Sequence, residues 1–215
     1  MTEETTANLR QQYLQNLLAA RRKEAHDLIM DAYHRGLPIP AIYADVMQEA
    51  LYEVGRLWEA NRISVAEEHL STAITQFVMS SLYPHLEISP NFRGRMVLTG
   101  VQGELHQVGA NMVADLLEAD GWDVLFLGAD VEPERVLQAV SEHQATLLGI
   151  SVTMLVNIPR AAALVQLIRT RQGDRAPRIL LGGGAFVALE QLPPELEDCL
   201  LARTLPEALE LTRRI

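Results

Sequence analysis

The sequence predicts a helical bundle followed by a doubly wound, Rossmann-like (flavodoxin-like) α/β domain with a five-stranded parallel sheet. In the first part of the chain, apolar residues recur at spacings of three and four, which indicates helices alone. In the second part, short apolar runs alternate with helical patterns, which is typical of a parallel sheet covered on both faces. A polar segment separates the two parts. We therefore expect a helical cap domain at residues 1–88 and an α/β domain at residues 93–215.

The composition is that of a folded globular protein. Of the 215 residues, 48% are hydrophobic and 21% are charged, which excludes wholesale disorder. The net charge is −10, and neither half is basic, which argues against direct binding to nucleic acid. The single cysteine, Cys199, excludes an internal disulfide and a cysteine-rich zinc site. Without an apolar leader or a run long enough to span a bilayer, we expect a cytoplasmic protein that does not bind membranes.

The helical part divides at turn signals. The pattern over residues 8–35 predicts one bent helix or two, and a Gly and two Pro residues at 35–40 interrupt it. A second helix is expected over about 41–59. Ser64 and Glu67 have the spacing of a capping box, which predicts the start of a third helix that runs to Tyr83. The whole predicts a bundle of about four helices.

The α/β part contains a series of short apolar runs, and most of them are followed by a helical pattern. Prolines at positions 133 and 159 open two of these helices. Ligands on such sheets bind beyond the carboxyl ends of the strands, so the loops after the strands are the expected functional sites. The predicted strands are 95–101, 122–128, 147–153, 178–184 and, more weakly, 199–202.

The loop after the first predicted strand contains a histidine and a glutamate that are candidates for metal binding. It has neither a dinucleotide-binding fingerprint nor a phosphate-binding loop. It places His106 two residues after Glu104, at the expected start of a helix. An imidazole is the commonest transition-metal ligand, and a carboxylate on its other nitrogen fixes the tautomer. The alternative is a surface or capping histidine. One His and one Glu are too few to hold a bare ion, so a metal would arrive inside a cofactor.

This loop resembles a known signature. The residues Glu104-Leu105-His106-Gln107-Val108-Gly109 are similar to the D-x-H-x-x-G motif of cobalamin-binding domains, with Glu in place of Asp. The resemblance implies that His106 is the lower axial ligand of cobalt. Two further segments resemble the elements that hold the cofactor's nucleotide tail, namely Ser151-Val152-Thr153 and Gly182-Gly183-Gly184. The family's G-A-D element is not evident after the fifth strand, which leaves that end of the tail pocket undefined. Methionine synthase and its relatives also carry a helical cap before this domain.

Residues of the predicted cap resemble those of one group of cobalamin-binding proteins in particular. Trp58, Glu68 and His69 are similar to the W-x9-E-H signature of the CarH/LitR-type photoreceptors, which bind adenosylcobalamin. The resemblance implies that Trp58 shapes the space for the upper adenosyl group and that Glu68 and His69 line the upper face. These receptors also carry Glu before the lower histidine, as at Glu104. The alternative for Trp58 is core packing at a helix end. Some of these receptors have, directly after the Trp, a histidine that binds cobalt once light has removed the adenosyl group. That position is Glu59 here, so His69 or water would take the site.

Three functions follow from the resemblance. The first is a stand-alone adenosylcobalamin-dependent light sensor for signalling or transcription regulation, in which photolysis of the Co–C bond changes the packing of the cap. It would act through a regulatory protein partner rather than by DNA binding, because the chain is acidic and few residues precede the first helix, where gene-repressing receptors carry a MerR-like domain. The alternatives are a corrinoid carrier subunit of a methyltransferase system and a cobalamin storage or delivery protein. In the first and last roles the chain is not an enzyme, and an oligomer remains open.

Overall fold

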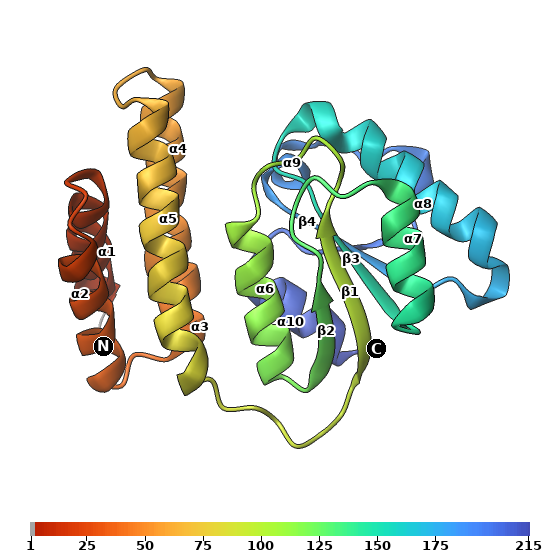
Figure 1. The fold of residues 1–215 in the computed structure, drawn as a ribbon, viewed down its shortest axis with the longest axis horizontal. Coiled ribbons are helices and arrows are strands. Elements are labelled where there is room, and N and C mark those ends of the chain that lie inside the picture. The colour runs from red at the N-terminus through yellow and green to blue at the C-terminus, as the bar shows by residue number, and fades with distance from the viewer. Residues whose placement is uncertain (1–2) are drawn as a thin grey trace. The chain divides into compact units, whose positions relative to one another are not determined.

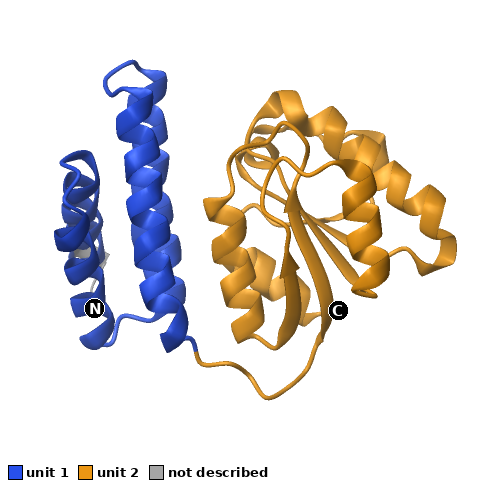
Figure 2. Ribbon diagram, in the orientation of Figure 1, with its two compact units in different colours: residues 1–86 blue, residues 87–215 orange. Residues whose placement is uncertain are grey.

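The computed structural model describes residues 3–215 and divides into two compact units (Figure 2). The first unit ends at Leu86, and the second runs from Glu87 to Ile215. Each unit has its own core of buried apolar residues. Within the described chain, none of the helices combines the length and the apolar character needed to cross a membrane.

The first unit is entirely helical, as the sequence predicts (Figure 1). Its opening stretch forms two helices rather than one bent helix, because the chain turns at Ala20, which adopts a positive φ of 56°. The helices are α1 (Glu3–Leu18), α2 (Arg22–His34), α3 (Ile39–Ala41), a π-helical segment η1 (Ile42–Gln48), α4 (Glu49–Glu59), α5 (Val65–Leu82) and a 3₁₀ turn η2 (Tyr83–His85).

Two sets of side-chain hydrogen bonds stabilise this unit, one at the start of α5 and one in the core. The capping box at the start of α5 is confirmed, since the Glu67 amide donates to the Ser64 hydroxyl and the Ser64 amide donates to the Glu67 carboxylate. In the core, the fully buried Tyr13 of α1 donates its hydroxyl to Thr75 of α5 at 3.1 Å. Thr75 in turn donates to the Ser71 carbonyl at 3.0 Å. Burial raises the pKa of Tyr13 far above its ordinary value.

The second unit is the expected doubly wound domain. All five strands are parallel and lie in the order β2-β1-β3-β4-β5, which is the flavodoxin-like order. The first strand has the predicted length and begins one residue earlier, whereas the other four strands are shorter than predicted. A short helix that the sequence did not reveal follows β4. The elements are β1 (Gly94–Gly100), α6 (Val108–Ala119), β2 (Trp122–Phe126), α7 (Pro133–Glu142), β3 (Leu147–Ser151), η3 (Leu155–Asn157), α8 (Ile158–Gln172), η4 (Gly173–Arg175), β4 (Arg178–Gly182), α9 (Gly184–Ala188), η5 (Pro194–Leu196), β5 (Leu200–Leu201) and α10 (Leu205–Arg213).

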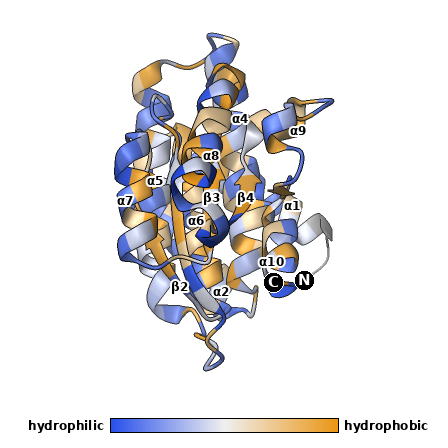
Figure 3. Ribbon diagram, turned by 90° about the vertical axis from the view of Figure 1, so that its right-hand side faces the viewer, coloured by the Kyte–Doolittle hydropathy of each residue, from blue (hydrophilic) through white to orange (hydrophobic). Residues whose placement is uncertain are grey.

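The sheet buries both of its faces. On β1, Val97 belongs to the core shared with α7 and α8, whereas Met96 and Leu98 belong to the core shared with α6 and α10. The hydrophobic strands therefore lie between helices (Figure 3). At the carboxyl edge, the register pairs Ser151 with Gly100 on one side and with Gly182 on the other. This register brings the loops after β1, β3 and β4 to one edge of the sheet.

Candidate functional site

The loop after β1 is held in place by its own backbone and by the neighbouring loop. Gly103 has a φ of +81°, a conformation that glycine adopts without strain. Its amide donates to the Asp130 carboxylate at 2.7 Å, and the Glu104 amide donates to the Val101 carbonyl at 2.9 Å. The resulting turn directs the Glu104 side chain into the protein and leaves His106 at the surface, because Glu104 is fully buried and the His106 side chain is 49% exposed.

Glu104 is the centre of a hydrogen-bond network. One carboxylate oxygen, Oε1, accepts from the backbone amide of His106 at 3.2 Å and contacts the ring Nδ1 at 2.5 Å. The other, Oε2, accepts from the amides of Thr153 and Met154 at 2.8 and 3.1 Å and from Asn157 Nδ2 at 3.2 Å. Burial by itself would raise the pKa of Glu104, but these hydrogen bonds outweigh it and lower the pKa to about 2. Glu104 is therefore an anion that accepts a hydrogen bond from the Nδ1–H group of His106.

This arrangement defines which nitrogen of His106 can act as a ligand. With Nδ1 directed at Glu104, Nε2 is the nitrogen that would meet a metal, and the carboxylate makes that nitrogen more basic. Among residues 3–215, no three His, Cys, Asp or Glu side chains are grouped so as to hold a metal ion. The donor set therefore fits a metal that brings its other ligands with it, as cobalt does within a corrin ring.

The glycines after β4 have different physical roles. Gly183 has a φ of +102°, and a Cβ there would lie 2.3 Å from the Val152 carbonyl oxygen, so the backbone itself requires glycine. At Gly182 and Gly184 a Cβ would meet its nearest neighbours only at 3.6 and 3.8 Å. These two glycines leave room beside the partly buried Ser151 and Thr153, the two hydroxyl-bearing residues predicted to bind the tail. Such a space suits a bulky group that approaches the backbone.

The remaining residues of the predicted motif lie at the start of α6. Gln107 is the residue that precedes the helix, and Val108 is its first residue and is buried. Leu105 is 76% exposed. Gly109 has no neighbour within 4 Å of the place where a Cβ would stand, so the surface above it is open.

The sequence reasoning missed part of this edge. Met154, Leu155 and Val156 follow β3 and are exposed by 44, 53 and 74%, like Leu105 in the loop after β1. The two loops are adjacent because Glu104 binds backbone amides of the second loop. Several large, exposed apolar side chains on two adjacent loops indicate a surface that binds an apolar group. The run of three apolar residues directly after a strand was the signal that could have revealed them.

The predicted cap residues lie together at one end of the helical unit. Trp58 is in the last turn of α4, and Glu68 and His69 are in the first turns of α5, on either side of the loop that joins these helices (Figure 1). Trp58 is 43% exposed, which differs from the core-packing alternative. The Glu68 carboxylate lies 3.5 Å from His69 Nε2 and accepts from the Thr72 hydroxyl at 3.1 Å.

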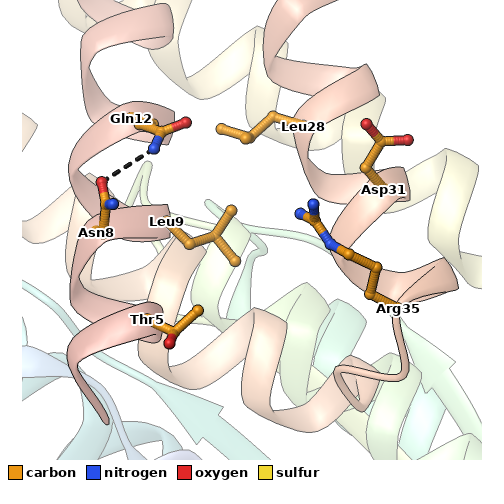
Figure 4. A pocket seen from close by; sticks show the side chains of 7 residues that line it. All are labelled: Thr5, Asn8, Leu9, Gln12, Leu28, Asp31 and Arg35. Atoms are coloured by element: carbon orange, nitrogen blue, oxygen red, sulfur yellow. Dashed lines mark hydrogen bonds between the residues drawn. The ribbon is translucent and has the colours of Figure 1, made fainter. Parts of the chain in front are cut away.

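A shallow groove on the same unit contains none of the predicted site residues. It lies between α1 and α2, has a volume of about 550 Å³ and is open to solvent (Figure 4). Most of the residues that line it have polar side chains. The residues that line it are Thr5, Asn8, Leu9, Gln12, Leu28, Asp31 and Arg35.

Comparisons with known proteins agree with the interpretation of the chain as a protein that binds a corrinoid. The chain is similar to a corrinoid protein of Desulfitobacterium hafniense, with 21% identity over 88% of this chain and 90% of the relative. It is also similar to monomethylamine corrinoid protein 2 of Methanosarcina acetivorans, with 24% identity over 73% of this chain and 74% of the relative. Among solved structures, the monomethylamine corrinoid protein of Methanosarcina barkeri shares the fold, with a TM-score of 0.85, 20% identity and coverage of 97% of this chain and 98% of that one.

Family models cover both units. A model described as a B12 binding domain matches residues 94–209, which include the His106 loop and every strand of the sheet. A second model with the same description matches residues 9–83, the helical unit with Trp58, Glu68 and His69. The chain therefore belongs to the family of B12-binding, or cobalamin-binding, proteins.

Proposed function

We propose that this protein is a corrinoid carrier that holds cobalamin with His106 as the lower ligand of cobalt. The observation that supports this most directly is the buried Glu104 carboxylate, which contacts His106 Nδ1, so that Nε2 is the nitrogen that would bind cobalt. The carrier role is supported by the similarity to two corrinoid proteins, over 88% and 73% of this chain. As such a carrier the chain would not catalyse methyl transfer alone, and its protein partner would be a methyltransferase subunit.

The chain's own residues would divide the work of holding the cofactor. Leu105, Met154 and Val156 would pack against the lower face of the ring, and the space at Gly182 and Gly184 would receive the nucleotide tail. When bound, the corrinoid would supply the cobalt atom and its bond to an upper carbon ligand. In a carrier this ligand would be the methyl group that is handed on, and in a light sensor it would be the adenosyl group that light removes.

The test is the absorbance spectrum of the protein loaded with cobalamin. We expect a histidine-ligated spectrum for the wild type. His106→Ala should keep the fold but give a spectrum without histidine ligation and release the cofactor faster. His143→Ala, which changes a histidine of the same unit that contacts the Asp123 carbonyl, is the matched control. A His106→Ala protein with the wild-type spectrum and retention would contradict the proposal.

The cap favours a second candidate function, an adenosylcobalamin-dependent light sensor with a regulatory protein partner. The observation behind it is the exposed Trp58 at the same helical end as Glu68 and His69. An exposed indole offers a flat surface to an adenosyl group, and the two polar side chains offer hydrogen-bond partners. A methyl group needs none of these.

The two candidates predict different cofactor preferences. A light sensor should bind adenosylcobalamin about tenfold or more tightly than methylcobalamin, on the scale of a few hydrogen bonds and the buried area of a ring. Trp58→Ala should reduce that preference, and green light should change the spectrum of the loaded protein. Equal affinity for both cofactors, with no lasting spectral change after light, would favour the carrier.

A further inference from the structure

We propose that the groove between α1 and α2 binds a small zwitterion, namely an α-amino acid with an aliphatic side chain. The carboxylate of the ligand would pair with Arg35, and its ammonium group would pair with Asp31. Its aliphatic part would lie on Leu9 and Leu28. The inference goes beyond the proposed function, because the groove contains none of the residues assigned to the cofactor.

The two charged side chains of the groove do not pair with each other. Asp31 and Arg35 are one helical turn apart at the end of α2, in the order that favours an ion pair. Lys23 and Asp27 have the same spacing on α2 and do pair, although their order is the less favourable one. Among residues 3–215, neither Asp31 nor Arg35 has a side-chain ion pair or hydrogen bond. Figure 4 shows that the Arg35 guanidinium extends over the groove instead.

The opposite wall of the groove offers a donor and an acceptor in a fixed arrangement. On α1, Gln12 Nε2 donates to Asn8 Oδ1 at 2.9 Å. This hydrogen bond leaves the NH₂ group of Asn8 and the carbonyl oxygen of Gln12 to serve a ligand. Leu9 and Leu28 lie between the two polar walls (Figure 4). The volume of about 550 Å³ is within the range of small-molecule sites.

A ligand that satisfies both unpaired charges must itself carry both signs. Residues one turn apart on a helix have Cβ atoms about 5–6 Å apart, so one small molecule can reach both side chains. A simple anion would be repelled by the Asp31 carboxylate, and a simple cation would be repelled by the Arg35 guanidinium. An α-amino acid carries a carboxylate and an ammonium group on one carbon. An aliphatic side chain also gives it apolar area to bury on the two leucines.

The experiment is an NMR titration of the whole 215-residue chain with L-leucine, followed at the backbone amides and at the Arg35 Nε–H group. We expect saturable shifts at the residues that line the groove and at Arg35 Nε–H, where the carboxylate binds. Leucinamide lacks the carboxylate, and N-acetyl-leucine lacks the ammonium group. Each should bind about tenfold or more weakly than L-leucine, on the scale of a hydrogen bond to a charged group. Glycine should also bind more weakly, because it has no apolar area to bury.

Two variants test the charges of the groove. Asp31→Asn and Arg35→Gln should each weaken the binding of L-leucine by about tenfold or more. Both residues are exposed, so we expect the variants to fold like the wild type. The matched controls are Asp27→Asn, one turn earlier on the same helix, and Arg21→Gln, just before the helix begins. Both controls should bind L-leucine as the wild type does.

Three results would overturn the inference. The first is a titration without saturable shifts at the groove. The second is equal binding of L-leucine, leucinamide and N-acetyl-leucine, because the groove would then not recognise both charges. The third is that Asp31→Asn and Arg35→Gln bind L-leucine as tightly as their controls do. None of these measurements requires cobalamin, so their outcome and that of the test of the proposed function are independent.

Discussion

At the scale of single residues, the three consecutive glycines after β4 show how identical residues serve different ends. Gly183 combines a positive φ with a carbonyl oxygen 2.3 Å from where a Cβ would stand, so its role lies in the fold. Gly184 has ordinary contact distances, so its role would lie in the space it leaves for a ligand. A motif read as a ligand-binding element therefore contains at least one residue that the backbone needs regardless of any ligand.

This difference predicts that alanine substitution at Gly183 mainly lowers stability and that alanine substitution at Gly184 mainly lowers cofactor retention. Gly183→Ala should destabilise the α/β unit by about 3 kcal/mol or more, from backbone strain and overpacking together. Gly184→Ala should cost less than about 1 kcal/mol in stability but should weaken cobalamin retention, because the methyl group enters the space proposed for the tail. Urea unfolding measures the first effect and cofactor release the second. Equal losses of stability in the two variants would contradict this division.

At the scale of elements, a buried hydrogen-bond chain joins the first and last long helices of the cap unit. The Tyr13 hydroxyl of α1 donates to Thr75 of α5, which donates onward to the Ser71 carbonyl. The phenol has no access to solvent, so its anion would be buried away from water. Burial in the folded unit therefore favours the neutral form of Tyr13.

The raised pKa of Tyr13 predicts a loss of stability in alkali. In the unfolded chain a tyrosine ionises near its ordinary pKa of about 10, whereas burial keeps Tyr13 protonated in the folded protein. Its contribution to folding is therefore fully present below pH 10 and is lost as the pH rises above that value. Tyr13→Phe should cost about 1 kcal/mol at neutral pH and reduce the alkaline loss, measured by chemical unfolding from pH 7 to 11. Tyr83→Phe, at a half-exposed tyrosine, is the control and should retain the full loss.

At the scale of the whole molecule, the segment that joins the two units is attached to the second unit. The Ser89 and Arg93 amides donate to the carbonyls of Ala119 and Gly121 at 2.8 and 3.0 Å. Asp120 lies between two arginines, with Arg93 Nε at 2.6 Å and Arg213 at 2.9 Å. Residues 89–93 of the polar segment therefore belong to the second unit.

This attachment predicts that Asp120→Asn loosens the segment without disturbing the sheet. Two partly exposed ion pairs are lost, so the cost in stability should be roughly 1 kcal/mol. Hydrogen exchange at residues 89–93 should speed up, while exchange within β1 stays unchanged. Asp123→Asn, at a more exposed aspartate that contacts Arg95 and His143, is the control. Unchanged exchange at 89–93 in Asp120→Asn would show that the backbone bonds alone hold the segment.

Local features of this protein were readable from the sequence because they depend on neighbours within a few residues. The periodicity predicted the helical unit and the alternation of strands and helices, and the capping box at Ser64 is where its spacing indicates. Glu104 and His106 are two residues apart, so their pairing needed only a turn. Short motifs, above all Glu104 to Gly109, carried the resemblance to cobalamin-binding domains, which the matching family models support.

The tertiary structure decided everything that joins distant segments. The strand order, the contacts of Glu104 with Thr153, Met154 and Asn157, and the guanidinium of Arg160 against Gly103 link residues about fifty positions apart. Local spacing carries no information about such pairs, because they form only when parallel strands align and bring their loops to one edge. The sequence alone therefore determined most of the helices and strands and the position of the histidine loop. Only packing decided which distant side chains hold that loop, because those contacts depend on the register of the sheet.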